Sequence, residues 1–441
     1  MSNDNNDNRR KFLQKTSAAA GVIAAPMLWH SSAHAQWNNQ PEKGAKLRVL
    51  RWKRFVQGDE DQYIKNVKAF SDKYKIDVKL DQEGWEDVRP KAAVAANTGA
   101  GPDIILSTND DANLYPDKLV DMTDVCDYLG KKYGGWYPAC EAFLRPDGKK
   151  WIGVPLGGTG SMMVYRDSQL KAAGINAFPK DTDGFLKMFQ ALKAKGTPGG
   201  MALGHATGDS GWTQWLMWAF GGALVDKNNK VTINSPETIK ALEYSKELYA
   251  TFIPGTLSWL DPNNNKAFLD GQVSVTNNGI SIYYAAKNSS DPKLLDMAKD
   301  IQHATFPIGP VGVPTEYHLF FNQMVFKHSK YPKAAKEFVR FMMEQEQYGP
   351  WMQAAGGYIS QPLRAYENNP VWTADPKNTP YRDSVKNLRP AGYAGKLGYA
   401  SAGALADFIV QDMVAEAASG SKTPKEAAER AQQRAERYYK V

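Results

Sequence analysis

The 441-residue sequence contains very little cysteine. Only Cys126 and Cys140 are present, and neither has the spacing to a histidine that zinc sites use. We therefore expect no metal site and no cofactor. A disulfide between the two cysteines is favoured, because closing the short loop between them would constrain the unfolded chain by ~3 kcal/mol. Two free thiols are the alternative.

Long hydrophobic runs are also absent. The weakly apolar stretch 18–29 is shorter than the ~20 residues that a membrane-spanning helix needs. It follows the paired Arg9 and Arg10 and precedes a small-x-small pattern at residues 33–35, which a signal peptidase cuts. We predict a twin-arginine signal peptide at residues 1–35 and a periplasmic location for the remainder. A disordered basic tail is the alternative.

Recognisable catalytic and nucleic-acid-binding motifs are missing. The Gly-rich run 157–160 has no Lys-Ser/Thr ending, and no Gly-x-Ser-x-Gly elbow is present. The adjacent acids Asp110 and Asp111 are more typical of a surface than of a glycosidase dyad. The net charge of +7 is mild, and basic residues are interleaved with acidic ones. We predict a protein that is not an enzyme and has no nucleic-acid partner.

The first part of the chain has the pattern of a parallel sheet covered by helices. Strand-like residues at 46–50, 76–80 and 103–106 alternate with helical patterns at 59–74 and 85–97. Strand and helix in this order predict an α/β fold.

A second α/β region follows along the chain. Strands are predicted at 151–155, 162–165 and 273–276, and helices at 185–195, 236–252, 333–346 and 404–418, with a final helix from Thr423. Residues 306–314 contain too much proline and glycine for either element and are predicted to be a linker.

Several segments resemble the family 1 extracellular solute-binding proteins, the maltose-binding-like receptors of ABC importers. The similar segments occur in the family's order at residues 101–105, 109–110, 119–124, 151–155, 164–167, 268–273, 278–279, 309–310, 325–330, 334–338, 418–420 and 423–427. Each is short, but their shared order extends the resemblance over essentially the whole chain after the signal peptide. After residues 356–359 the chain reads Ser-Gln-Pro-Leu-Arg, which departs from the family's pattern.

The resemblance implies a two-lobed periplasmic-binding-protein fold with a hinge between the lobes. We expect residues 46–155 and 306–356 to form one lobe, and residues 156–305 and 357–441 to form the other. It also implies a monomeric receptor that captures a carbohydrate or sugar-like solute and delivers it to the permease subunits of an ABC transporter in the inner membrane.

Two other functions remain open. The same receptor fold could hold an anion, a polyamine or an amino acid, and an anion could be held by arginines at positions 54, 364, 382 and 389. An exported carbohydrate-active enzyme is the other alternative.

A sugar site needs flat aromatic side chains for the C–H faces and polar side chains for the hydroxyls. Twelve Trp and twenty-one Tyr are more than a core of this size needs. The candidate ligand-binding residues lie at predicted strand ends and in loops: Trp52, Asn109, Asp110, Trp212, Trp215, Asn278, Tyr284, Trp351, Tyr358 and Tyr399. By the resemblance, Asp110 matches a sugar-contacting acid, and Tyr399 lies in a segment that carries a stacking aromatic.

Several candidates have a structural alternative. Trp52 and Trp351 fit a core position as well as a cleft. Trp215 lies three residues before Trp218, a helical spacing that favours the core for at least one of them. Trp212 is the preferred stacking residue, and we expect it to face Asp110 across the cleft.

Overall fold

The structure, a computed structural model, describes residues 37–440; the predicted signal peptide lies outside them. The strands are β1 (Lys46–Trp52), β2 (Asp77–Glu83), β3 (Ile104–Thr108), β4 (Val154–Thr159), β5 (Met162–Arg166), β6 (Val275–Asn278), β7 (Ile301–Ala304) and β8 (Leu319–Val325). The helices before β6 are α1 (Gln57–Tyr74), α2 (Trp85–Thr98), α3 (Thr123–Lys132), α4 (Pro138–Leu144), α5 (Asp167–Ala172), α6 (Thr182–Ala194), α7 (Trp212–Ala219), α8 (Pro236–Tyr249) and α9 (Asp261–Leu269). The later helices are α10 (Ser281–Lys287), α11 (Pro292–Asp300), α12 (Pro332–Met342), α13 (Gln345–Ala354), α14 (Val371–Ala374), α15 (Ser384–Asn387), α16 (Tyr399–Ala406), α17 (Ile409–Ser419) and α18 (Pro424–Ala435).

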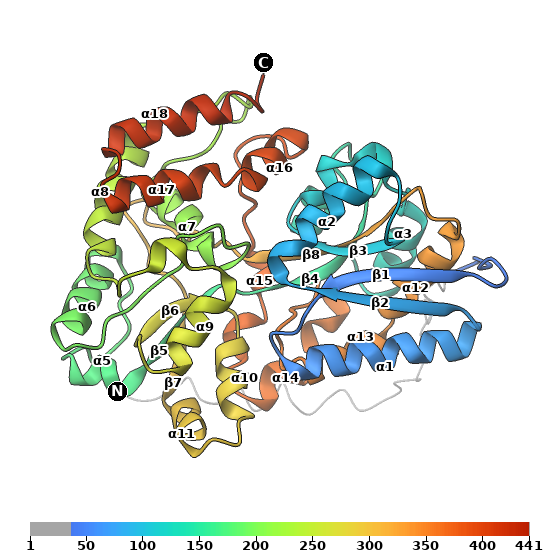
Figure 1. The fold of residues 1–441 in the computed structure, drawn as a ribbon, viewed down its shortest axis with the longest axis horizontal. Helices are drawn as coiled ribbons and strands as arrows, with labels where there is room; N and C mark the ends of the chain where they lie inside the picture. Colours follow the sequence, from blue (N-terminus) through green and yellow to red (C-terminus); the bar gives the residue numbers. More distant parts are fainter. Residues whose placement is uncertain (1–36, 441) are drawn as a thin grey trace, which may run out of the picture. The chain divides into compact units, whose positions relative to one another are not determined.

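The first sheet has five strands in the order β2-β1-β3-β8-β4 (Figure 1). Strand β1 is parallel to β2 and to β3, which confirms the predicted parallel arrangement of the first three strands. Strand β8 is antiparallel to both of its neighbours and was not predicted. It comes from much later in the chain, so the order of strands in the sequence could not place it.

The second sheet is separate from the first and has three antiparallel strands in the order β6-β5-β7. The chain passes from the first sheet to the second between β4 and β5, and it returns between β7 and β8. The return contains residues 306–314, which form no helix or strand, as predicted. Two sheets joined by such crossings form the two-lobed α/β fold that the sequence predicted.

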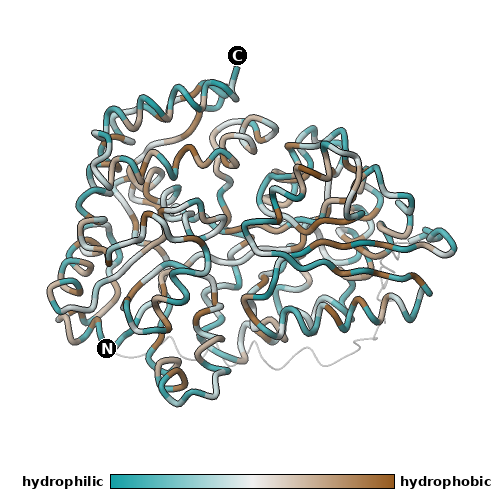
Figure 2. Tube along the Cα trace, in the orientation of Figure 1, coloured by the Kyte–Doolittle hydropathy of each residue, from teal (hydrophilic) through white to brown (hydrophobic). Residues whose placement is uncertain are grey.

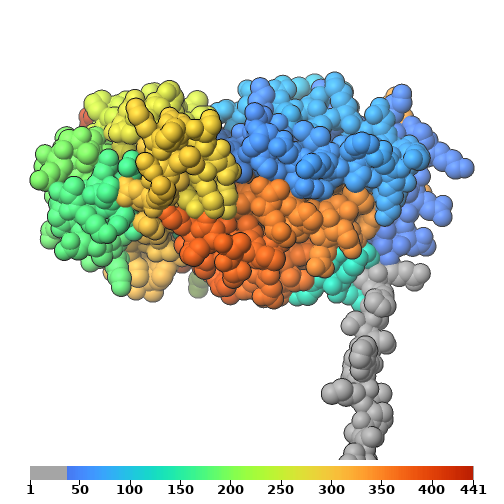
Figure 3. All heavy atoms as spheres, turned by 90° about the horizontal axis from the view of Figure 1, so that it is seen from below, coloured from blue at the N-terminus to red at the C-terminus, as the bar shows by residue number. Residues whose placement is uncertain are grey.

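Helices bring distant parts of the chain against the first sheet. Helix α1 packs against α12 and α13, although these helices lie far apart in the sequence. Figure 3 shows the early part of the chain, in blue, beside the later part, in orange. A structure of this kind needs both segments before its core is complete, because the buried face of each helix is covered by the other.

The apolar side chains gather inside both lobes. Figure 2 shows hydrophobic stretches, in brown, along strands of the first sheet and along helices of both lobes. All seven residues of β8 are buried, as expected for a strand covered on both faces. Helix α7 is buried throughout, and its tryptophans belong to a second cluster that includes Phe185 and Met413.

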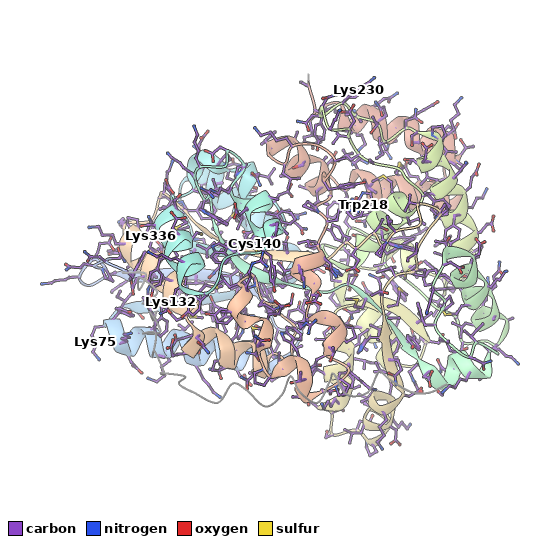
Figure 4. All side chains as sticks on the ribbon, turned by 180° about the vertical axis from the view of Figure 1, so that it is seen from behind. Lys75, Lys132, Cys140, Trp218, Lys230 and Lys336 are labelled. Carbon is purple, nitrogen blue, oxygen red and sulfur yellow. The ribbon has the colours of Figure 1, made fainter. Side chains whose placement is uncertain are left out.

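The two cysteines are free thiols, so the favoured disulfide is wrong. Cys126 and Cys140 lie inside the first lobe, where Cys140 is labelled in Figure 4. Each thiol lies close to a separate backbone carbonyl, of Gly153 and of Pro362 respectively. Burial raises the pKa of both thiols, which keeps them protonated and unreactive.

The predicted helix at 404–418 is two helices. Helix α16 ends at Ala406 and α17 begins at Ile409, and Phe408 between them has a φ of +51°. The ring of Phe408 stacks on His205, with 4.4 Å between the ring centroids. Phe408 and His205 lie far apart in the sequence, so the local hydrophobic pattern did not reveal the break between the two helices.

Candidate functional site

A small cavity with a volume of about 30 Å³ lies where the two lobes meet. Its lining includes residues from the strand ends and loops of both lobes: Phe55, Trp85, Thr159, Gly160, Ser161, Gly208, Asp209, Asp261, Asn278, Gly279, Ser281, Leu319 and Tyr358. This volume is about that of one water molecule and is far below the range for small-molecule sites, so the lobes would have to move apart to admit a solute. A solute that contacts both lobes binds the closed state more tightly than the open state and therefore favours closure.

One wall of the cavity is aromatic. Phe55 follows β1, Trp85 opens α2, and Tyr358 follows α13. The rings of Phe55 and Tyr358 are stacked with centroids 6.2 Å apart, and Trp85 meets Phe55 edge to face at 5.9 Å. These rings present flat apolar surfaces of the kind that the C–H faces of a sugar contact.

A second layer of aromatic side chains holds this wall in place. Trp52 stacks on Phe321 at 4.9 Å, and it meets the edge of Trp85 at 5.0 Å. Trp52 is fully buried and does not line the cavity. It therefore supports the aromatic wall from behind. Of the two positions considered for Trp52, core and cleft, the structure shows the core position.

The wall from the second lobe is polar, and Asp261 organises it. Its carboxylate accepts backbone N–H groups from Thr207, Gly208 and Asp209 at 2.7, 2.8 and 2.8 Å. Burial raises the pKa of Asp261, although the three N–H groups oppose that shift by stabilising the charged form. These hydrogen bonds fix the loop before α7, which places Asp209 in the cavity lining.

Fewer hydrogen-bond donors stabilise the carboxylate of Asp209 than that of Asp261. Burial raises its pKa well above the ordinary range, and the neighbouring Asp261 adds to this effect. A hydrogen bond with Asn264 acts in the opposite direction. Thr159 also lines the cavity, and its buried hydroxyl has no hydrogen-bond partner. Two polar groups with spare bonding capacity therefore face the same space.

Asn278 and Gly279 line the cavity, as the sequence analysis proposed for Asn278. The Asn278 side chain accepts the backbone N–H of Gly279 at 2.6 Å and also donates to Asn265. A Cβ atom at Gly279 would lie 2.7 Å from the Thr159 hydroxyl. Asn278 thus shapes the cavity, and Gly279 allows the two lobes to approach closely.

A separate polar cluster joins the lobes beside this cavity. Asp110 accepts a hydrogen bond from Ser401 on α16 at 2.8 Å, and its other carboxylate oxygen is buried without a partner. Burial raises the pKa of Asp110 to about 6, while the Ser401 hydrogen bond lowers it. Asn109 donates to Tyr317 at 3.1 Å. Asp110 and Asn109 therefore contact groups from the other lobe and from the crossing, outside the cavity lining.

Three predicted tryptophans belong to the core. Trp212 is fully buried, and its indole N–H donates to the Ala202 carbonyl at 2.8 Å. Trp215 donates to the Pro307 carbonyl at 3.0 Å. Trp351 donates to Asp59 at 2.8 Å. None of these indoles lines the cavity, and Trp212 does not face Asp110 across it, because α7 turns its side chains into the second cluster.

The predicted tyrosines have three different surroundings. Tyr358 lines the cavity. Tyr284 covers the turn at Gly356 and exchanges hydrogen bonds with Asn378 at 3.1 and 2.8 Å. Tyr399 is 63% exposed at the start of α16. Of these, only Tyr358 contributes to the lining.

Sequence reasoning did not place Phe55, Trp85, Thr159, Asp209 and Asp261 among the candidate ligand-binding residues. Phe55 carried a usable signal because it follows a predicted strand, and Asp209 lies in a loop whose small, polar and aromatic residues are typical of a sugar site. Trp85 was assigned to a helix without a functional role.

The arginines considered for an anion lie elsewhere. Arg54 pairs with Glu60 at 3.0 Å and Arg382 with Asp383 at 2.9 Å. The other two stack over aromatic rings, Arg364 over Tyr137 and Arg389 over Tyr393. None of the four lines the cavity.

Within residues 37–440, no group of three or more His, Cys, Asp or Glu side chains is placed to hold a metal ion. Over the same residues, no helix combines the length and hydrophobicity needed to cross a bilayer.

Two α/β lobes around a small aromatic and polar cavity define a solute-binding protein by architecture. The chain belongs to the bacterial extracellular solute-binding proteins, whose family description matches residues 65–380. This confirms the resemblance found in the sequence.

Individual relatives agree with this assignment. An ABC transporter-binding protein of Deinococcus radiodurans is 27% identical over 262 residues, which cover 56% of this chain and 60% of that protein. The diacetylchitobiose-binding protein DasA of Streptomyces coelicolor is 24% identical over 299 residues, 66% of this chain and 68% of DasA.

Solved structures show the same fold. The GacH receptor of Streptomyces glaucescens has a TM-score of 0.75 at 20% identity, covering 90% of this chain and 99% of GacH. The maltose-bound MalE3 of T. maritima has a TM-score of 0.75 at 18% identity, covering 89% and 99%.

Proposed function

We propose that this protein is a periplasmic receptor that captures a carbohydrate or polyol between its lobes and delivers it to an ABC-transporter permease. The observation that carries the proposal is the cavity, which has ring faces on one wall and hydrogen-bonding groups on the other. Sugars need this combination, since each buried hydroxyl left unpaired costs ~1–3 kcal/mol. The solved relatives include complexes with maltose, D-mannitol and ribitol, which support this solute class.

We further propose the lobe division made from the sequence, residues 46–155 with 306–356 and residues 156–305 with 357–441. The pairing of β8 with β3 and β4 supports the return of the chain to the first lobe. Two details favour slightly different boundaries. Strand β4 continues to Thr159, and Leu363 and Trp372 pack in the same cluster as the first sheet.

The hinge and the export route are part of the same proposal. The crossings should let the lobes close on solute, and small-angle scattering should show compaction when a tight ligand is added. Export by the twin-arginine route should need Arg9 and Arg10. Replacing both with lysine should leave precursor in the cytoplasm, and normal periplasmic appearance of that variant would contradict the route.

The binding test starts with a thermal-shift screen over sugars, polyols, sugar acids and amines. A ligand that binds only the folded state raises the melting temperature by mass action. Calorimetry then compares the wild type with Gly279→Ala, whose Cβ would press on the Thr159 hydroxyl inside the cavity. We expect a loss of affinity of tenfold or more.

The matched control for this experiment is Gly398→Ala. It adds the same methyl group where no atom lies within 4 Å. It should bind as the wild type does. Equal affinity of Gly279→Ala and Gly398→Ala would place the solute outside this cavity.

A further inference from the structure

The charges around the cavity have one sign. Asp209 and Asp261 are its charged lining residues, and no lysine or arginine lines it. Glu86, on α2 beside Trp85, adds a third negative charge that raises the pKa of Asp261. The nearby Arg51 is held in a buried ion pair with Asp59 at 2.5 Å.

The two lining acids are not equivalent. Three backbone N–H groups already stabilise the charge of Asp261. Asp209 is about nine-tenths buried, and the groups that shift its pKa include no basic side chain. Taking a carboxylate out of water without a cation is costly, so Asp209 gains most from a positive partner. Such a partner would have to come with the solute.

The aromatic wall adds a second, independent attraction for a cation. Phe55, Trp85 and Tyr358 line the cavity opposite the two acids. The negative face of an aromatic ring attracts a cation, and groups of such rings bind ammonium ions. The unpaired hydroxyl of Thr159 lies in the same space and is nine-tenths buried. It would accept a hydrogen bond from an ammonium or hydroxyl group.

We propose that the solute of this cavity carries a protonated amine in addition to its hydroxyl groups, and that Asp209 is the residue that selects this charge. The inference rests on the proposed function and narrows it to amino sugars and amino polyols. Hydroxyls would bond to the polar wall, the carbon skeleton would lie on the rings, and the ammonium group would pair with Asp209. A carboxylate or phosphate on the solute would meet two acids and be rejected.

The test uses matched triplets that differ in charge but little in shape. Each triplet contains an amine, a neutral compound and an acid: D-glucosamine, D-glucose and D-glucuronate; D-galactosamine, D-galactose and D-galacturonate; glucamine, D-sorbitol and D-gluconate. Calorimetry at pH 7 on the mature protein should show at least one amine binding tenfold or more tightly than its neutral partner. The acids should bind more weakly than either.

Asp209→Asn removes the charge and keeps the shape of the side chain. It should abolish the tenfold preference for the amine and change the affinity for the neutral partner by less than threefold. Asp270→Asn, at an exposed site just after α9, is the control and should keep the preference. If Asp209→Asn does not fold, the wild-type triplets still decide the question.

The outcomes separate the inference from the proposed function. Neutral sugars that bind as tightly as the amines, or acids that bind best, would overturn the inference and leave a carbohydrate receptor. Failure of every amine to bind would also overturn it. The proposed function fails only if the broader thermal-shift screen finds no sugar or polyol.

Discussion

The buried carboxyl of Asp110 should make the stability of this protein depend on pH in an unusual direction. Burial raises its pKa from 3.8 to about 6. The folded state therefore binds the proton more tightly than the unfolded state does. Stability contributed by this group is fully present below pH 3.8 and is lost as the pH rises to about 6.

The size of the effect follows from the shift. About two pKa units correspond to ~3 kcal/mol, since each unit is worth 1.36 kcal/mol. Asp110→Asn replaces the carboxyl with an amide that stays neutral throughout. The free energy of unfolding of this variant, relative to the wild type, should increase by ~2–3 kcal/mol between pH 4 and pH 7.

Urea unfolding at several values between pH 4 and pH 7, followed by tryptophan fluorescence, measures this difference. Asp117→Asn is the control, because Asp117 is an exposed aspartate of the same lobe. Its difference from the wild type should stay constant across the range. A constant difference for Asp110→Asn as well would refute the argument that burial controls the ionisation of Asp110.

Three further predictions concern stability and reactivity. Asp261→Asn should lower the free energy of unfolding by ~1–3 kcal/mol, because its amide cannot accept all three backbone N–H groups; urea unfolding at pH 7 measures it. Lys75→Gly should raise the free energy of unfolding by ~1 kcal/mol, because Lys75 has a φ of 57° at the exposed C-terminal end of α1 (Figure 4). Cys126 and Cys140 should resist a maleimide in the folded protein and both react in urea, as mass spectrometry would show.

Each of these predictions has an outcome that contradicts it. Asp261→Asn with unchanged stability would mean that the three N–H groups do not depend on the carboxylate. Lys75→Ala is the control for Lys75→Gly, and equal stability of the two would exclude relief of backbone strain. A mass that stays two hydrogens too low and unlabelled in urea would show that the cysteines form a disulfide.

Local patterns predicted most of the helices and strands. The spacing of Tyr63, Val67 and Phe70 identified α1, and all three are buried in the structure. The cap at Thr423 also began α18 as expected, with its hydroxyl accepting the N–H of Glu426. These features depend on neighbours within about one helical turn, so the sequence contains the information that determines them.

The two-lobed fold and the receptor function were predicted from the resemblance to a known family. Short segments in a shared order were enough for that assignment, and the family match at residues 65–380 confirmed it. The fold class therefore depended on the order of weak motifs along the chain rather than on any single one of them.

The sequence identified Asn278 and Tyr358 among the cavity residues, but only the tertiary structure decided which tryptophan lines the cavity. Trp212 and Trp85 are both tryptophans at the first position of a helix, yet the first is enclosed by core side chains and the second faces the cavity. Which one meets the solute depends on how each helix is rotated against its lobe and on how the lobes meet. Those contacts join residues hundreds of positions apart, and no local pattern in the sequence encodes them.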